Sequence, residues 1–336
     1  MTDNALILPT PDTLLIAGQV ANDFAAANVF EDYRQRIAAN TLRRQEADLA
    51  LFTSFLKEAG VIPGPLNQAA EAWRGMTWGL IAAFARWQIA SGYAIGSVNV
   101  RLATVKRYAE LAHQAGAIDA DAYLLIQTVR GYGHKQARQV DEKRDVTRRG
   151  PKKAQATRLT REQIAALKAQ PDTPQGRRDA LLMTLLLDHG LRCGEITGLE
   201  VEAFDLQAGT FTFHRPKVDK VQTHKLTGDA WRAAGAYLTQ DGPSIGGLLL
   251  GSHKGGRLGG AMSARAIHKR VRQLGQRIGV ERLAPHDCRH AWATCAAQGG
   301  TDPFRLQEAG GWNSLTMPRR YIDEQKIANE GVVLAH

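Results

Sequence analysis

Two residue pairs with helical spacing give this sequence its first chemical signal. His286 and Arg289 are three residues apart, so a helix places both on one face, and Arg192 and Glu195 share this spacing. Arginine side chains hold oxyanions such as phosphate through paired N–H donors, and an imidazole beside them adds a further polar group. The sequence therefore predicts an anion-binding site assembled from two helices.

A tyrosine near the end of the chain could supply a nucleophile for such a site. Tyr321 follows Trp312 by nine residues, and Arg319 and Arg320 precede it directly. Ionising a tyrosine of ordinary pKa costs roughly 4 kcal/mol at neutral pH, so neighbouring cations or a base must reduce that cost. Taken alone, Tyr321 could equally be a core aromatic residue, with His286 only capping its helix.

A predicted β-hairpin carries a lysine that could act as a general acid. Residues 210–214 alternate in polarity and residues 222–226 can return as a paired strand, with a turn at 218–220. Lys217 lies at the tip, where a flexible ammonium could swing into a site and protonate a leaving group. Lys220 is the competing choice.

The order and intervals of these residues resemble the tyrosine recombinase (phage integrase) family, over about residues 158–325. Most members have Gly-His where this chain has Gly311-Trp312, and the Gly-Gly-Trp form with its nine-residue step to Tyr321 resembles Cre recombinase. An indole donates a hydrogen bond but cannot shuttle protons. Residues 97–107 are similar to part of the family's N-terminal core-binding domain.

The resemblance implies an enzyme that cleaves and rejoins duplex DNA through a 3′-phosphotyrosine intermediate and exchanges strands between two sites. No cofactor and no metal are implied. A tetramer on two specific DNA sites is implied, with the tail after Tyr321 packing on a neighbouring protomer. An accessory DNA-bending or directionality protein stays an open question. The implied catalytic residues are Tyr321, Arg192, Arg289, Lys217, His286 and Trp312, with Glu195 orienting its neighbours.

Three alternatives compete with this interpretation. A type IB topoisomerase uses similar tyrosine, arginine and lysine chemistry without exchanging partners, and a non-catalytic DNA-binding descendant would keep basic surfaces but lose site residues. His286 and His290, with Cys288 between them, could form half a zinc site. The two-domain size, the Gly-Gly-Trp motif and the presence of all the site residues favour the recombinase, and the sequence offers no third zinc ligand of suitable spacing.

Composition points to the same class of partner. The 43 lysines and arginines exceed the 33 acids, and a net charge of +10 favours nucleic acid over an anionic membrane. No apolar run reaches the roughly 18 to 20 residues of a membrane span. The three cysteines fit packing roles in a reducing compartment. We expect a cytoplasmic, nucleoid-associated protein that uses no membrane.

The predicted fold is mainly α with a small antiparallel β-sheet. We expect an N-terminal extension over 1–25, a helical core-binding domain over 26–130, a basic linker over 131–157, an α+β catalytic domain over 158–322 and a tail over 323–336. Helices are predicted at 41–59, after Thr77, after Ser97 and over 119–130, and then at 164–167, 179–189, 230–238 and 264–278.

Basic residues outside the catalytic set are the DNA-binding candidates. They face solvent in the simplest interpretation, but a basic segment between two domains also fits a phosphate backbone. They are Arg101, Lys106 and Arg107 in the helix after Ser97, Lys135, Arg148, Arg149, Lys152 and Lys153 in the linker, and Lys220 in the hairpin.

Overall fold

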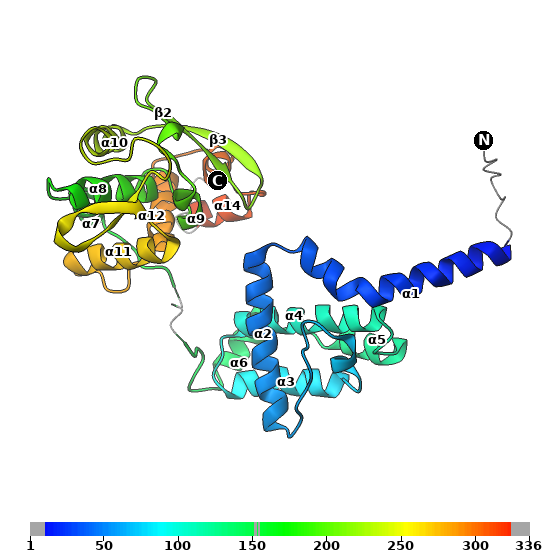
Figure 1. Ribbon diagram of the computed structural model, residues 1–336. Coiled ribbons are helices and arrows are strands. Elements are labelled where there is room, and N and C mark those ends of the chain that lie inside the picture. Colours follow the sequence, from blue (N-terminus) through cyan, green and yellow to red (C-terminus); the bar gives the residue numbers. More distant parts are fainter. Residues whose placement is uncertain (1–10, 151–152, 154, 324–336) are drawn as a thin grey trace, which may run out of the picture. The chain divides into compact units, whose positions relative to one another are not determined.

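The chain folds into two compact units, Met1–Ala154 and Gln155–His336. The computed structural model describes residues 11–150, 153 and 155–323 (Figure 1). Both units are mainly helical and the second adds two small antiparallel sheets, which confirms the predicted fold class. Within the described residues, no helix combines the length and apolar character needed to cross a bilayer.

The N-terminal unit is a bundle around an aromatic core. Phe52, Trp73 and Phe84 are fully buried against one another. Thr77 caps the helix that was predicted to follow it, and Asp119, predicted to begin a helix, caps α5; both side chains accept from backbone N–H groups of the first turns. The elements are α1 (Pro11–Arg36), α2 (Ala39–Glu58), η1 (Ala70–Trp73), α3 (Trp78–Ala90), α4 (Ile95–Gln114), α5 (Ala120–Thr128) and α6 (His134–Asp141).

Two helices of this unit differ from the expectation. The helix predicted to follow Ser97 begins earlier, at Ile95, after an Ala94 that provides no side-chain cap. Helix α1 occupies most of the segment predicted to be an extension, and its first half projects away from the bundle (Figure 1). Leu14, Leu15 and Ile16 are all exposed there. Consecutive apolar residues cannot share one helix face, so no periodic signal marked this helix.

Part of the basic run assigned to a linker folds onto the N-terminal unit. It contains α6, and the Arg144 guanidinium that follows donates to the carbonyls of Ile89 and Tyr93 at 3.2 and 2.9 Å. Arg144 also pairs with Asp141 at 2.5 Å. Ile89 lies in the last turn of α3 and its carbonyl also accepts from the Gly92 N–H at 2.9 Å, so Arg144 adds a second donor at this helix end.

The C-terminal unit packs helices around a three-stranded sheet of order β1-β2-β3 and a separate β4-β5 pair. In the hairpin, Phe211 lies opposite His224 and Arg215 opposite Lys220. The elements are α7 (Arg161–Lys168), α8 (Pro174–Leu187), α9 (Cys193–Thr197), η2 (Val201–Ala203), β1 (Phe204–Asp205), β2 (Thr210–Arg215), β3 (Lys220–Lys225), α10 (Gly228–Gln240), β4 (Leu250–Ser252), η3 (Lys254–Gly256), β5 (Leu258–Ala261), α11 (Ala264–Arg277), α12 (Pro285–Gln298), α13 (Pro303–Gly310) and α14 (Thr316–Asp323).

Helix α8 forms the centre of this unit, with Leu181, Leu182 and Leu185 fully buried. It packs against α7, α10 and α12. Gly190 ends the segment with a φ of +60°, and an added Cβ would lie 2.2 Å from the Trp292 ring, so only glycine fits. Of the cysteines, Cys288 is buried and Cys193 half-buried, whereas Cys295 is exposed. The expectation that all three pack inside is wrong for Cys295, because its position in α12 faces solvent.

Candidate active site

The Tyr321 hydroxyl ends a chain of hydrogen bonds that runs along α12. Tyr321 lies on α14 and is only 4% exposed. Its hydroxyl oxygen is 2.8 Å from Nδ1 of His290, and Nε2 of His290 is 3.1 Å from Nε2 of His286. The two histidines are one turn apart on α12, and His286 is exposed at the outer end. Sequence reasoning treated His290 only as a metal ligand and missed this contact, although its spacing from His286 placed both on one face.

Arg289 lies one turn beyond His286 and is 3% exposed. Its guanidinium donates to the Gly190 carbonyl and, at 2.6 Å, to the Gly310 carbonyl. Its Cζ lies 4.6 Å from the centre of the Trp312 ring, in a cation–π contact. Burial, with the nearby charge of Arg192, lowers the pKa of Arg289 to about 9, so the group stays charged at neutral pH.

Arg192 and Glu195 meet as the sequence predicted. Arg192 is the N-cap of α9, and the Glu195 carboxylate accepts from its backbone N–H and from Nη1, both at 2.7 Å. The Arg192 side chain is 25% exposed and that of Glu195 only 2%. Glu195 is therefore an internal partner for cations, while Arg192 reaches the surface of the site.

A third arginine, which sequence reasoning missed, completes the cluster. Arg215 is fully buried at the end of β2, and its Nη1 donates to both oxygens of Glu195, at 2.9 and 2.8 Å. Its Nε donates to Gln222 on β3. The signal was present, because strand alternation puts Arg215 on the same inward face as Phe211 and Phe213.

Three successive backbone carbonyls at the end of α13 accept from these three arginines. The Ala309 carbonyl accepts from Arg215 at 2.7 Å and the Gly311 carbonyl accepts from Arg192 at 3.3 Å. The Gly310 carbonyl between them accepts from Arg289. The last carbonyls of a helix lack intrahelical partners and carry the negative end of the helix dipole, so they attract cations.

The two glycines before Trp312 are required by this packing. Gly311 has a φ of +58°, and an added Cβ would lie 2.5 Å from Cδ of Arg215. At Gly310 an added Cβ would lie 2.1 Å from the Trp312 ring. The Trp312 ring in turn lies 6.0 Å from the ring centres of both Trp292 and Tyr321. The Gly-Gly-Trp motif thus brings an aromatic wall beside the tyrosine.

The hairpin places its two candidate lysines differently. Lys217 lies in the turn between β2 and β3 and is exposed, and its charge is among those that lower the pKa of His286. Lys220 is the first residue of β3 and forms an ion pair with Glu308 at 2.5 Å. Of the two, Lys217 is the lysine whose charge acts on His286, whereas Lys220 is held against α13 by Glu308.

Positive charge is in excess at the centre of the site. The Glu195 carboxylate pairs with Arg192 and Arg215, and the buried Arg289 lies close enough to feel the charges of all three, so guanidiniums outnumber the buried carboxylate. Desolvation, followed by the charge of Arg289, lowers the pKa of His286 and keeps this imidazole neutral. Such an arrangement can hold a phosphate dianion or stabilise negative charge that develops on one.

The DNA-binding candidates on α4 all have partners inside the N-terminal unit. Arg101 lies over the Tyr93 ring at 4.4 Å and Arg107 pairs with Glu110 at 2.8 Å. Lys106 donates to the carbonyls of Gln127 and Val129, at 2.8 and 3.1 Å, and so caps the end of α5. Burial and then the charge of Arg130 lower the pKa of Lys106. Their role in DNA binding stays a prediction.

The basic-run candidates are more open to solvent. Lys135, Arg148 and Arg149 are exposed, and Lys153 is partly buried. Arg148 donates to the Lys153 carbonyl at 3.1 Å and Arg149 lies 5.5 Å from the Tyr93 ring centre. Lys152 lies outside the described residues.

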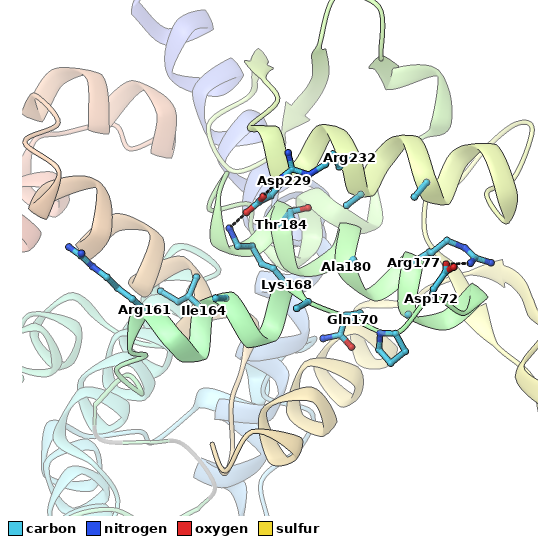
Figure 2. Close-up of a pocket in the computed structure, with 16 residues that line it drawn as sticks. Arg161, Ile164, Lys168, Gln170, Asp172, Arg177, Ala180, Thr184, Asp229 and Arg232 are labelled. Atoms are coloured by element: carbon cyan, nitrogen blue, oxygen red, sulfur yellow. Dashed lines mark hydrogen bonds and ion pairs between the residues drawn. The ribbon is translucent and has the colours of Figure 1, made fainter.

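A separate hollow of about 580 Å³ lies between α7, α8 and α10, and several of its charged side chains pair with one another (Figure 2). Lys168 pairs with Asp229 at 2.5 Å, and Arg177 pairs with both Asp172 and Asp241. None of the proposed catalytic residues lines it. Residues 11–150, 153 and 155–323 contain no cluster of three or more His, Cys, Asp or Glu side chains suited to a metal ion.

Comparison with known proteins identifies the family. The phage integrase family matches residues 157–327, which is half of the chain and includes every element of the site, and the chain belongs to this family. Tyrosine recombinase XerD of Neisseria meningitidis is 30% identical over 188 residues, covering 54% of this chain and 62% of that protein. Tyrosine recombinase XerC of Pseudomonas aeruginosa is 34% identical over 158 residues, covering 46% and 50%.

The curated relatives are thus matched over only half to three fifths of their length. Solved structures resemble the chain more completely. The Tn1549 transposon integrase, solved in complex with a circular intermediate DNA, has a TM-score of 0.60 at 16% identity, over 88% of this chain and 94% of that one. Lambda integrase, solved as a dimer bound to a core site, has a TM-score of 0.56 at 15% identity, over 87% and 96%. These two likenesses show a shared fold.

Proposed function

We propose that this protein is a site-specific tyrosine recombinase that cleaves and rejoins duplex DNA, with Tyr321 as nucleophile. The observation that carries the proposal is the position of the Tyr321 hydroxyl, 2.8 Å from an imidazole nitrogen and beside a cluster with excess positive charge. Family membership and relatives named tyrosine recombinases support it.

The scissile phosphate binds to Arg192 and Arg289. The Tyr321 oxygen attacks phosphorus, the bond from phosphorus to the 5′ oxygen breaks, and a 3′-phosphotyrosine with a free 5′ hydroxyl results. Negative charge on the non-bridging oxygens is stabilised by the fixed guanidiniums and by the Trp312 indole N–H. Glu195 does not touch DNA, because its carboxylate is buried against Arg192 and Arg215.

The leaving 5′ oxygen takes its proton from Lys217. The hairpin turn leaves this ammonium exposed, and its charge acts on His286, so it lies on the side of the site where the phosphate would bind. Lys220 is a weaker candidate because its ammonium already donates a hydrogen bond to the Glu308 carboxylate. Rejoining reverses these steps, and one phosphoester replaces another without external energy.

The biological unit is a tetramer on two DNA sites. Basic residues from α4 and from residues 131–157 contact the backbone, so affinity falls steeply with salt. The tail assigned to 323–336 packs on a neighbouring protomer, although residues 324–336 lie outside the described part of the chain. The enzyme acts in the cytoplasm on nucleoid DNA, and an accessory bending or directionality protein can assist it.

Covalent trapping on DNA tests this function. Nicked suicide duplexes drawn from DNA that flanks the gene are incubated with wild type, Tyr321→Phe and Tyr123→Phe, and adducts are resolved on denaturing gels. The expected adduct forms with wild type and with Tyr123→Phe, whose ring stacks on His113 in the other unit. It is lost with Tyr321→Phe.

Two other outcomes separate the competing functions. Tight DNA binding without any adduct would identify a non-catalytic descendant. An adduct together with relaxation of supercoiled plasmid, but no exchange between two labelled duplexes that carry the trapped site, would identify a topoisomerase-like enzyme.

A further inference from the structure

We infer that His290 accepts the phenol proton of Tyr321 during strand cleavage and relays a proton to His286. This inference rests on the proposed function and assigns the immediate proton acceptor for the nucleophile. The Tyr321 hydroxyl meets Nδ1 of His290 at 2.8 Å, and the opposite ring nitrogen of His290 meets Nε2 of His286 at 3.1 Å. The contact to Tyr321 therefore belongs to His290, and His286 lies behind it.

The buried and exposed ends of this chain suit a proton path. Tyr321 is 4% exposed, His290 is half-buried and His286 is exposed. The His290 ring lies 4.5 Å from that of His286 and 5.4 Å from that of Tyr321, so both contacts use the same imidazole. A proton that leaves the buried hydroxyl reaches the surface in two transfers without crossing the arginine cluster.

Proton positions follow from the direction of transfer. For Tyr321 to donate, Nδ1 of His290 must be unprotonated, so neutral His290 carries its proton on Nε2 and donates it to Nε2 of His286. Neutral His286 then carries its proton on Nδ1. The opposite arrangement, in which His290 donates from Nδ1 to the tyrosine oxygen, would stabilise a phenolate but could not remove its proton.

As the bond between the Tyr321 oxygen and phosphorus forms, the phenol proton moves to Nδ1 of His290, and the Nε2 proton of His290 moves to Nε2 of His286. His286 becomes an imidazolium at the exposed end of the chain. The 5′ oxygen leaves with a proton from Lys217. In the rejoining step each proton returns along the same path.

The charged groups around His286 favour its neutral form, which can accept a proton, and disfavour the imidazolium that forms after the transfer. Along α12, Arg289 and Asp287 act on His286 with opposite signs, and Arg192 from α9 and Lys217 from the hairpin add positive charge. From α14, Tyr321 contacts His290. A bound phosphate would offset the positive charges and favour the imidazolium when the nucleophile attacks.

The decisive variant is His290→Asn, whose amide oxygen occupies nearly the place of Nδ1 and can orient Tyr321 but cannot take its proton. Single-turnover adduct formation on the trapped duplex is followed from pH 7 to 9, beside His253→Asn on an exposed loop as the control. We expect at least a 100-fold loss at pH 7, in the range typical of general-base removal. The variant's rate should rise about tenfold per pH unit, because the phenol must ionise unaided, while wild type changes little.

Wild-type rates for His290→Asn at pH 7, or an equal loss at every pH, would overturn the relay and leave His290 a positioning residue. Failure of the proposed function gives a different pattern, in which wild type forms no adduct. A measurement without DNA then still decides the relay. Nitrogen-15 NMR of labelled histidines in the full chain, assigned with His290→Asn, should show His290 with an unprotonated Nδ1; a protonated Nδ1 in the neutral ring would contradict it.

Discussion

The Arg215 Nη1 donates to both oxygens of the Glu195 carboxylate, at 2.9 and 2.8 Å, and the two side chains are 0% and 2% exposed. Arg192 binds the same carboxylate from the side nearer solvent. The buried Glu195 therefore holds two arginines in place: the internal Arg215, and Arg192, which binds the phosphate in the proposed mechanism. The pair links β2 to α9, which are distant in sequence but adjacent in the core.

Replacing Arg215 by Met should destabilise the C-terminal unit by about 3 to 5 kcal/mol, because it leaves a buried carboxylate with only one cation and leaves Gln222 and the Ala309 carbonyl without their donor. Urea unfolding of the full chain measures this loss. Arg74→Met removes the exposed pair with Glu71 and should change stability by under about 1 kcal/mol. Equal losses of stability for Arg215→Met and Arg74→Met would contradict the burial of Arg215.

Replacing Gly311 by Ala should cost more than the same change at Gly300. Both glycines have positive φ, +58° and +78°, and both lose about 1 to 2 kcal/mol from the left-handed backbone. Only at Gly311 does the new Cβ approach Arg215, whereas nothing lies within 4 Å at Gly300. The excess at Gly311 is expected to be about 1 to 3 kcal/mol, as for other over-packed positions. Thermal or urea unfolding of both variants provides the comparison, and equal losses would argue against this packing.

His189 and His224, whose rings both pack against Phe211, should make the fold sensitive to acid. Burial lowers the pKa of His189 to about 4, and burial, together with the charges of His189 and Arg215, lowers that of His224 to about 4. Nε2 of each ring is buried without a hydrogen-bond partner among the described residues. Protonation of either ring inside the fold is therefore unfavourable.

Whether acid stabilises or destabilises the fold depends on which state, folded or unfolded, binds protons first as the pH falls. The unfolded chain, with histidine pKa near 6.5, takes up protons before the folded state does, so stability is complete above pH 6.5 and falls as pH drops toward 4. His189 alone contributes roughly 3 kcal/mol to that loss. Urea unfolding at pH 7, 6 and 5 should show it, and His189→Leu should flatten the curve while exposed His253→Leu should not. A wild-type curve with no loss between pH 7 and 5 would refute the prediction.

Deleting residues 325–336 should leave site binding intact and abolish pairing of two sites, because the proposed tail contacts a neighbouring protomer. Gel-shift titration measures binding, and native gels with two labelled duplexes measure pairing. Recombination by the truncated protein at the wild-type level would contradict this prediction. The deleted residues lie outside the described structure, so the prediction rests on the family resemblance and on their position directly after Tyr321.

Local spacing explains which parts of the site were predictable. His286 and Arg289 share a helix face and Arg192 and Glu195 have the same spacing, so the grouping within each pair followed from sequence alone. The Gly-Gly-Trp motif was recognised only through the family resemblance. Arg215 was not recognised because a charged residue at a strand end usually faces solvent, and only the tertiary position of Glu195 makes an inward arginine favourable. His290 was overlooked because its partner, Tyr321, comes from another helix. Helix α1 lacked the one-sided apolar pattern on which helix prediction depends.

The row of carbonyls from Ala309 to Gly311 has a consequence for building chimeras of this protein. Three donors from β2, α9 and α12 converge on one turn, and that turn leads directly into the segment that carries Tyr321. A graft of α13 and α14 from another family member would therefore succeed only if the recipient supplied arginines at all three donor positions. Exchange boundaries placed before α9, so that the donors and their shared turn are inherited together, should preserve function far better than boundaries placed after α12.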